Sequence, residues 1–238
     1  ISPLEDLLRK ETDSERHGKL QLIHRNALRL LDMVNEILDF RKADKQQQRL
    51  HLLSGNIVEF VKNICSGFRE LAGRRISLTF HSSVKTLVMR FDEDKVRKVM
   101  NNLLSNAFKF TDDDGRVDVS LRVITRQTGD TSSPDMLEIR VSDTGVGIND
   151  EDKRHIFDRF YQAEHTRETP YGGTGIGLNL VKSFVELHDG QVSVADNPGG
   201  GTVFVVMIPI RQDAAAATAT PSQHANGDPQ PRHDVLVV

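Results

Sequence analysis

The sequence predicts an α+β fold, a two-layer α/β sandwich that follows a helical hairpin. Up to about residue 48, apolar side chains recur at steps of three and four, which is the spacing of helices. Further along, residues 117–123 and 137–141 alternate apolar and polar side chains, as half-buried strands do. Helical patterns separate the strand-like runs, and helices packed on one face of a mixed sheet bury both in one core.

Residues 1–48 predict a pair of helices. Residues 1–11 place leucines at helical spacing, and Thr12–Glu15 has the pattern of a capping box, which bonds the first free N–H groups of a helix. A wide apolar stripe then runs at steps of four and three and includes Leu20, His24, Ala27, Leu31, Val34, Leu38 and Arg41. Such a helix needs partners in water. We therefore expect residues 14–45 to form a homodimer as a four-helix bundle.

Residues 49–211 predict the α/β sandwich itself. The expected elements are a helix from Ser54 to Leu71 ended by Gly73, strands over 76–80 and 86–90, a helix from Asp92 to Phe110, antiparallel strands over 117–123 and 137–141, a helix over 176–188, and strands over 191–196 and 202–210. Residues 212–232 are rich in Ala, Thr, Pro and Gln without periodicity, so they predict a linker. An apolar run closes the chain over 233–238.

The composition excludes several classes of function. A formal net charge of -3 provides no basic field that would attract nucleic acid. The single cysteine, Cys65, cannot form an internal disulfide, and its apolar neighbours predict that it packs in the core. No apolar run approaches the ~20 residues that a membrane-spanning helix needs.

The first motif that carries chemistry is Asn102–Phe110, within the predicted helix over 92–110. Asn102, Asn106 and Lys109 recur at steps of four and three and therefore share one stripe of that helix. From this helix alone, a solvated polar face is the favoured interpretation of such a stripe. Asn is a mediocre helix former, however, so a pair of them in a helix middle invites another reason. An Asn oxygen can ligate Mg²⁺, which prefers oxygen ligands together with substrate phosphates.

The second motif, Asp143–Gly147, follows an alternating strand. A carboxylate can accept a hydrogen bond from the exocyclic amine of a base, and Gly145 and Gly147 allow the base to approach the backbone. Adenine carries an amine at C6 where guanine carries a carbonyl. A buried acceptor at Asp143 would therefore select ATP over GTP.

The third motif, Gly172–Leu178, opens the predicted helix over 176–188. Glycines at the start of a helix expose N–H groups to an anion, and the helix dipole favours phosphate there. The run is not a dinucleotide-binding fingerprint, because no strand directly precedes it, and it lacks the Lys of a Walker A loop.

In this order and spacing, the three motifs resemble the N, G1 and G2 boxes of sensor histidine kinases, which bind ATP in a Bergerat (GHKL) fold. The resemblance covers nearly all of residues 1–211 and implies ATP and Mg²⁺ as cofactors. It implies that Asn106 ligates the metal, that Lys109 contacts phosphate and that Asp143 binds the adenine amine. The other ATP-binding residues that it implies are Asn102, Phe110, Gly145, Gly147, Gly173, Thr174, Gly175, Gly177 and Leu178.

Between the second and third motifs, Ile156–Tyr161 resembles the F box of the same family. We expect Phe157 and Phe160 to serve packing rather than chemistry, and residues 162–172 to form a lid over the nucleotide.

The resemblance implies a kinase that transfers the γ-phosphoryl group of ATP to a histidine in a two-component phosphorelay. The family's acceptor histidine stands in a Ser-His-Glu-x-x-Thr-Pro box, and neither His17 nor His24 does. Ile1–Leu4 is similar to the segment just after that box. We therefore expect the acceptor upstream of this sequence and no catalytic residue within it.

Two other functions remain open. One is hydrolysis of ATP, as in the GHKL-type chaperone and topoisomerase ATPases, and the other is a non-catalytic, nucleotide-gated dimerisation scaffold. The hydrolysing relatives carry a glutamate one helical turn before the metal-binding Asn, where this chain has Asn102. A carboxamide cannot take a proton from water at neutral pH, so this substitution favours transfer over hydrolysis.

For the whole protein, the resemblance implies a hybrid sensor. Residues 233–238 resemble the first strand of a receiver domain, so the expected partner is a receiver domain of the same chain or of a response regulator. We expect the segment to be cytoplasmic, with a membrane anchor only in a longer parent protein.

Overall fold

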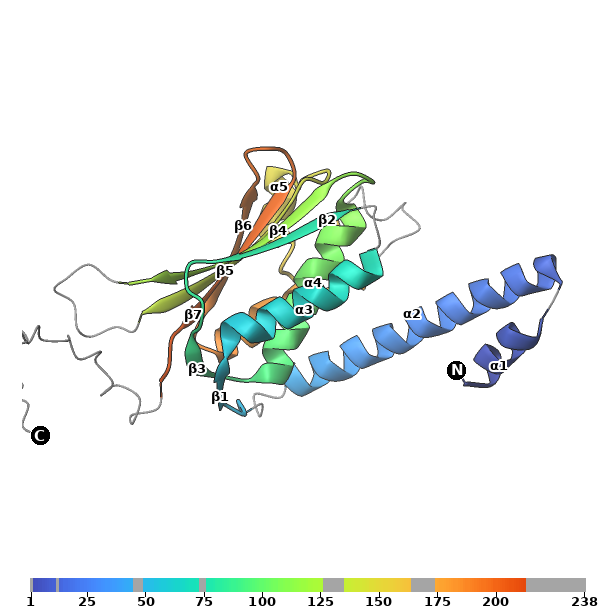
Figure 1. Cartoon of the computed structure of the whole chain (residues 1–238), viewed down its shortest axis with the longest axis horizontal. Coiled ribbons are helices and arrows are strands. Elements are labelled where there is room, and N and C mark those ends of the chain that lie inside the picture. Colours follow the sequence, from blue (N-terminus) through green and yellow to red (C-terminus); the bar gives the residue numbers. More distant parts are fainter. Residues whose placement is uncertain are drawn as a thin grey trace, which may run out of the picture.

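The computed structural model describes residues 2–11, 13–44, 49–72, 76–125, 135–163 and 174–212. A helical hairpin and an α/β unit meet at the C-terminal end of a long helix (Figure 1). In the hairpin, α1 (Ser2–Lys10) folds back beside the far end of α2 (Ser14–Asp44). The near end of α2 contacts α7 (Gly177–Leu187) of the α/β unit. The expected strand over 233–238 lies outside the described residues, as does the expected linker after Gln212.

The start of α2 is capped within the predicted segment by the carboxylate of Asp13, and the reciprocal bond of a capping box is not tested by the described residues. The Oδ1 atom of Asp13 accepts a hydrogen bond from the backbone N–H of Arg16 at 2.9 Å, and Glu15 and Lys19 form an ion pair one turn apart. Thr12 lies outside the described residues. None of the helices in the described part of the chain combines the length and the apolar character needed to cross a membrane.

A mixed sheet forms one layer of the α/β unit. Its strand order is β2-β4-β5-β7-β6, with β2 parallel to β4 and every other pair antiparallel. The strands are β2 (Ser77–Ser82), β4 (Arg116–Ile124), β5 (Met136–Asp143), β6 (Gln191–Asp196) and β7 (Thr202–Pro209). The predicted antiparallel pairing of the two alternating runs is confirmed as β4 with β5.

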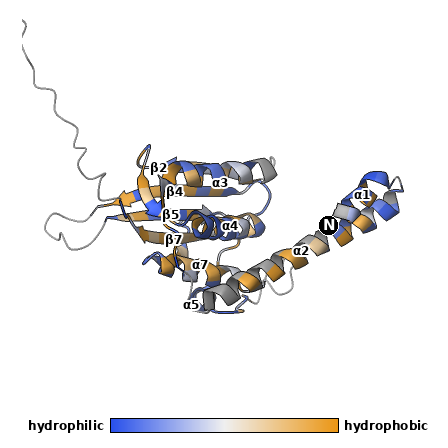
Figure 2. Ribbon diagram, turned by 90° about the horizontal axis from the view of Figure 1, so that it is seen from below, coloured by the Kyte–Doolittle hydropathy of each residue, from blue (hydrophilic) through white to orange (hydrophobic). Residues whose placement is uncertain are grey.

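Helices form the second layer, on one side of the strands (Figure 2). They are α3 (Ile57–Ala72), α4 (Glu93–Phe110) and α7, and the short helix α5 (Asp150–His155) follows β5. A single core of buried side chains, including Val61, Leu103, Val141 and Val181, joins the two layers. Cys65 is buried in it, as predicted. The two-layer α/β sandwich is therefore confirmed.

The predicted helix start at Ser54 is wrong. Ser54 lies in β1 (Leu53–Asn56), which pairs antiparallel with β3 (Val88–Phe91), and α3 begins only at Ile57. Backbone hydrogen bonds between β1 and β3, and the bond from the Ile57 N–H to the Leu87 carbonyl oxygen, pair the N–H groups that a cap at Ser54 would have bonded. Gly55 lies over the Phe91 ring, where an added Cβ would be 3.4 Å from Cε1.

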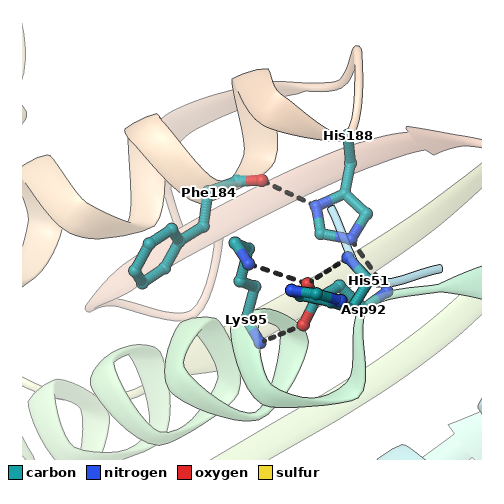
Figure 3. A network of polar contacts seen from close by, with 5 residues as sticks. All are labelled: His51, Asp92, Lys95, Phe184 and His188. Atoms are coloured by element: carbon teal, nitrogen blue, oxygen red, sulfur yellow. Dashed lines mark hydrogen bonds and ion pairs between the residues drawn. The ribbon is translucent and has the colours of Figure 1, made fainter. Parts of the chain in front are cut away.

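At the start of α4, Asp92 is 3% exposed and surrounded by donors (Figure 3). Its Oδ1 accepts from the backbone N–H of Lys95 at 3.1 Å, which is the N-cap bond of the helix. Its Oδ2 accepts from the Lys95 ammonium at 2.7 Å and from the backbone N–H of His51 at 2.9 Å. Burial alone would raise the pKa of Asp92, but these donors outweigh it and lower that pKa.

His188, at the C-terminal end of α7, contacts the same place. Its Nε2 accepts from the backbone N–H of Asp92 at 3.2 Å, and its Nδ1 lies 2.7 Å from the carbonyl oxygen of Phe184. A carbonyl only accepts, so Nδ1 carries the proton, and Nε2 must be bare to accept from an N–H. The imidazole is therefore neutral. Burial lowers its pKa, against the opposing effect of the Phe184 carbonyl.

The free energy of unfolding should consequently fall as the pH drops below about 6.5, the pKa of histidine in an unfolded chain. Below that pH, His188 of the unfolded chain takes up a proton that His188 of the folded chain does not bind. The free energy of unfolding therefore falls by at most about 1.4 kcal/mol for each pH unit. Urea unfolding should show a flatter pH profile for His188→Gln than for the parent. His81→Gln, at an exposed histidine of β2, is the control and should keep the parent slope; the same slope in His188→Gln would contradict a neutral His188.

Candidate functional site

One helix, α4, presents the three polar residues of the first motif on a single stripe. The opposite face of α4 is fixed in the core by Val96, Val99, Met100, Leu103, Leu104 and Ala107. Asn102, Asn106 and Lys109 are half-buried, at the edge of that core. The packing of the apolar face therefore determines where the polar stripe points.

Asn102 makes contacts that account for its position. Its Nδ2 donates to the carbonyl oxygen of Lys98 at 2.9 Å, one turn earlier in α4. Its Oδ1 lies against the start of α7, where a Cβ added to Gly177 would be 2.3 Å away. A side chain at Gly177 would displace the Asn102 carboxamide oxygen, because α7 begins directly on Asn102.

Asn106 and Lys109 lie one and two turns further along α4. No described residue hydrogen-bonds the Asn106 carboxamide, so its oxygen can ligate a cation or a bound water. The ammonium of Lys109 lies 4.7 Å from the centre of the Phe110 ring. The two side chains together form an electropositive, oxygen-bearing stripe suited to a metal–phosphate complex.

Asp143 ends β5 and is 5% exposed. Its Oδ1 accepts two backbone hydrogen bonds, from Gly145 at 2.9 Å and Thr202 at 3.1 Å. No described residue donates to Oδ2. Burial raises the pKa of Asp143, and the two N–H donors oppose that rise. A buried carboxylate with one oxygen left over gains from a ligand that brings a donor.

The turn over 144–147 rests on the C-terminal end of α4. The Val146 N–H donates to the carbonyl oxygen of Phe110 at 3.3 Å, and a Cβ added to Gly145 would lie 2.1 Å from that same oxygen. Gly147 has a φ of 76°, in the left-handed region that glycine tolerates. Glycine at 145 is what lets the turn approach α4 so closely. Phe110 thus contributes its backbone, which the sequence did not indicate.

The third motif forms the entrance to α7, and Gly173 lies outside the described residues. Thr174 Oγ1 accepts from the N–H of Ile176 at 3.2 Å. Gly175 has a φ of 70°, and a Cβ there would lie 2.6 Å from the backbone of Phe160. No side chain of the described residues caps the start of α7, so within this part of the chain its first N–H groups are available to an anion. Leu178 packs against the core.

The predicted packing role of the F-box aromatics is half right. Phe157 contacts Phe204 of β7 edge to face, with ring centres 6.2 Å apart. Phe160 is 64% exposed, with a φ of 62°, so its side chain does not fill the core. Its backbone N–H donates to the carbonyl oxygen of Gly175, which explains the unusual conformation. Residues 164–172 of the expected lid lie outside the described residues.

Sequence reasoning missed the turn between β6 and β7, which holds Asp143 from the other side. Asn197 Nδ2 donates to the Asp143 carbonyl oxygen at 2.8 Å. Gly201 has a φ of 93°, and a Cβ there would lie 2.2 Å from that carbonyl oxygen. The run Asn197–Gly201 contains Pro and three glycines, a turn signal that could have drawn attention to it.

Gly201→Ala should therefore destabilise the fold by about 1–3 kcal/mol, since the new methyl group meets the Asp143 backbone in a strained conformation. Gly199→Ala is the matched control, because nothing lies within 4 Å of its added Cβ, and it should change stability by at most about 0.5 kcal/mol. Urea unfolding measures both. Equal effects of the two changes would show that the close approach at Gly201 is not a constraint.

Comparisons with known proteins agree with this geometry. The family model for "Histidine kinase-, DNA gyrase B-, and HSP90-like ATPase" matches residues 91–212. Sensor histidine kinase TmoS of Ectopseudomonas mendocina is 36% identical over 233 residues, 97% of this chain but 23% of TmoS. Autoinducer 2 sensor kinase/phosphatase LuxQ of Vibrio cholerae is 33% identical over 231 residues, 96% of this chain and 26% of LuxQ. The chain thus spans a minor part of both relatives.

A solved structure confirms the fold. Full-length ShkA in complex with AMPPNP matches with a TM-score of 0.67 at 23% identity, covering 92% of this chain and 46% of the ShkA chain. The family match contains α4, the turn after Asp143 and the entrance to α7, which are the elements that form the candidate site. This chain belongs to the family of histidine kinase-, DNA gyrase B- and HSP90-like ATPases, with the Bergerat fold of a histidine kinase catalytic ATP-binding domain.

Proposed function

We propose that this chain is the ATP-binding and dimerisation core of a two-component sensor histidine kinase, which transfers the γ-phosphoryl group of ATP to a histidine side chain. The observation that carries the proposal is the Asp143 carboxylate, buried with Oδ1 held by two backbone N–H groups and Oδ2 left for a ligand. Similarity to TmoS, named a sensor histidine kinase, supports the reaction class.

Asp143 is suited to the adenine base. Because Gly145 and Thr202 both donate to Oδ1, the carboxylate cannot rotate without losing both bonds. Oδ2 therefore has a fixed direction and accepts from the C6 amine of adenine. Guanine would present a carbonyl oxygen to the same carboxylate, and two acceptors repel each other.

The phosphates and Mg²⁺ would lie along α4, between the two places where other segments of the chain contact this helix. The start of α7 lies on Asn102 and the turn after Asp143 lies on Phe110, with Asn106 between them along the helix. Asn106 would ligate Mg²⁺, Lys109 would contact phosphate, and the uncapped N–H groups of α7 would bind the anion. When bound, Mg²⁺ neutralises part of the phosphate charge.

Transfer to histidine is favoured over hydrolysis by Asn102. It occupies the place from which a glutamate would activate water, and its amide is already engaged with Lys98 and Gly177. In transfer, the bond from the γ-phosphorus to the bridging oxygen breaks, a bond to an imidazole nitrogen forms, and ADP leaves. The ring's other nitrogen then loses its proton to solvent.

We propose that the acceptor is neither His17 nor His24. His24 Nε2 is buried and lies 3.5 Å from the Glu5 carboxylate of α1, so it is not presented to a nucleotide. His17 Nε2 lies 3.0 Å from the Gln21 side-chain nitrogen on the same helix. The acceptor is then a histidine of another segment of the kinase, in the Ser-His-Glu-x-x-Thr-Pro context.

Helix α2 supports the dimerisation part of the proposal. Hydrophobic residues recur along it where it projects from the α/β unit (Figure 2). The exposed ones, at 45–63%, are Leu22, Ile23, Leu30, Leu31, Val34 and Leu38. A row of half-exposed leucines along one helix is costly in water unless another helix covers it. A second copy of the chain provides that cover in a four-helix bundle.

We further propose that the kinase passes its phosphoryl group to a receiver domain, of the same chain or of a separate regulator. This work takes place in the cytoplasm, where ATP is available.

Asp143→Asn should invert the base preference. The two backbone donors hold the Asn oxygen at the Oδ1 position, so the amide NH₂ replaces Oδ2 and faces the base. It should repel the adenine amine and pair with the guanine carbonyl. We expect ATP affinity to fall about tenfold, equivalent to about 1.4 kcal/mol, and the ratio of GTP to ATP affinity to rise. Titration calorimetry measures both affinities, and the control Asp118→Asn should bind both nucleotides like the parent. Equal affinity of the parent for ATP and GTP would contradict the adenine assignment.

The reaction itself can be tested with γ-labelled ATP and Mg²⁺. The chain should label a helical hairpin that carries the Ser-His-Glu-x-x-Thr-Pro sequence, with an acid-labile, base-stable bond, and should not label His17 or His24. Release of labelled phosphate into water without transfer would favour the hydrolase. ATP binding with neither outcome would favour the scaffold.

Leu31→Glu should separate the dimer, because it buries a charge in the proposed interface. Light scattering should give the mass of one chain for this variant and of two chains for the parent at the same concentration. Gln21→Glu, at an exposed polar position that is not one of these apolar residues, is the control and should stay dimeric. A parent that remains monomeric at high concentration would contradict the assembly.

A further inference from the structure

Two helices carry the proposed nucleotide groups, and besides the apolar packing of their facing sides in the core they make one further contact near each end. α4 carries Asn106 and Lys109, while the start of α7 supplies the uncapped N–H groups. At one place Gly177 lies on Asn102, and at the other His188 accepts the Asp92 N–H. The start of one helix thus meets the end of the other, so the two run antiparallel.

The two contacts lie at matching distances along the helices. Ten residues separate Asp92 from Asn102, or about 15 Å at 1.5 Å per residue, and eleven separate Gly177 from His188, or about 16 Å. Two contacts at nearly equal separation fix both the sliding and the tilt of α7 against α4. Without the contact at His188, the apolar packing of Leu180, Val181 and Phe184 would have to hold the register of the two helices, and such packing is less directional than a hydrogen bond.

We propose that His188 is a positioning residue for nucleotide binding: by joining the Asp92 N–H to the Phe184 carbonyl, it holds the phosphate-binding start of α7 in register with Asn106 and Lys109 of α4. This rests on the nucleotide site proposed above. His188 touches no nucleotide itself, since it lies at the opposite end of α7 from the third motif.

The imidazole is suited to this because it accepts and donates at once, on two sides of one rigid ring. It bonds α4 through Nε2 and the last turn of α7 through Nδ1. It is 3% exposed, so water does not compete for either bond. The Phe184 ring on the same turn lies 6.0 Å from the Lys98 ammonium of α4 and adds a further contact between the two helices.

The charged groups around His188 come from several segments. Asp92 and Lys95 face it from α4, Arg211 from the segment after β7, and the His51 backbone reaches Asp92 from the segment before β1. Arg211 also forms an ion pair with Asp189, the residue after His188. The carbonyl oxygen of Arg211 accepts a hydrogen bond from the N–H of Arg90. The end of α7 is therefore anchored on several sides. Its start contacts Asn102 of α4, and the Asn179 side chain in the first turn donates to the Phe157 carbonyl oxygen at 2.9 Å.

The test compares Mg²⁺·ATP affinity in the parent and three variants at about pH 8, where His188 is neutral. His188→Leu removes both bonds and should weaken binding about threefold or more, in the range of other residues that act through a network. His188→Gln keeps an acceptor for the Asp92 N–H and should recover part of that loss. His81→Gln should bind like the parent. Titration calorimetry is done well below each melting temperature, so that only folded protein is counted.

A merely structural role predicts a different pattern. His188→Leu would then melt earlier but, once folded, bind ATP like the parent, which would overturn the proposal. A parent that does not bind ATP would instead refute the proposed function, so the two failures are distinct.

If the variants do not fold, the proposal can be tested by hydrogen exchange on the unaltered chain. Coupling between sites is reciprocal, so ATP should slow hydrogen exchange of the Asp92 amide by about threefold or more. The exchange is read under conditions where the Ile139 amide, in the centre of β5, does not exchange, so that global unfolding makes no contribution. An Asp92 rate unchanged by saturating ATP would overturn the proposal.

Discussion

The burial of one face of α4 is the constraint on which the candidate site depends. Val99, Leu103 and Ala107 fix that face in the core, so the other side of the same helix must present Asn102, Asn106 and Lys109. Two loops from distant parts of the chain then reach this stripe, and each does so through a glycine. Gly177 lies on Asn102 and Gly145 lies on the Phe110 carbonyl. The site is assembled around α4.

Asp143 shows how backbone geometry gives a carboxylate a direction. Its Oδ1 is occupied by N–H groups from two loops, and its main-chain carbonyl is held by Asn197 and approached by Gly201. An acid buried in this way is costly to keep charged, and burial accordingly raises its pKa. A donor brought by a ligand offsets that cost. The same burial that raises the pKa of Asp143 therefore suits a ligand that brings a donor, such as a base with an amine.

Much of this could be predicted from the sequence, because the signals are local. The helix from Asp92 to Phe110, the alternating strands and the glycine-rich entrance to α7 follow from periodicity and turn residues. What could not be predicted depends on pairing across the fold. Ser54 resembles a cap, but a strand far along the sequence recruits it into β1. Neither Thr202 nor His188 carries a local sign that it bonds Asp143 or Asp92, since those contacts exist only after the sheet and helices have packed.

The most direct test of the account is a crystal structure of the chain with Mg²⁺ and a non-hydrolysable ATP analogue. The account predicts the adenine amine within hydrogen-bond distance of Asp143 Oδ2, at about 2.9 Å, and Mg²⁺ on Asn106 Oδ1 at about 2.1 Å. The phosphates should lie at the start of α7. A nucleotide bound with its base away from Asp143, or a metal held without Asn106, would contradict it.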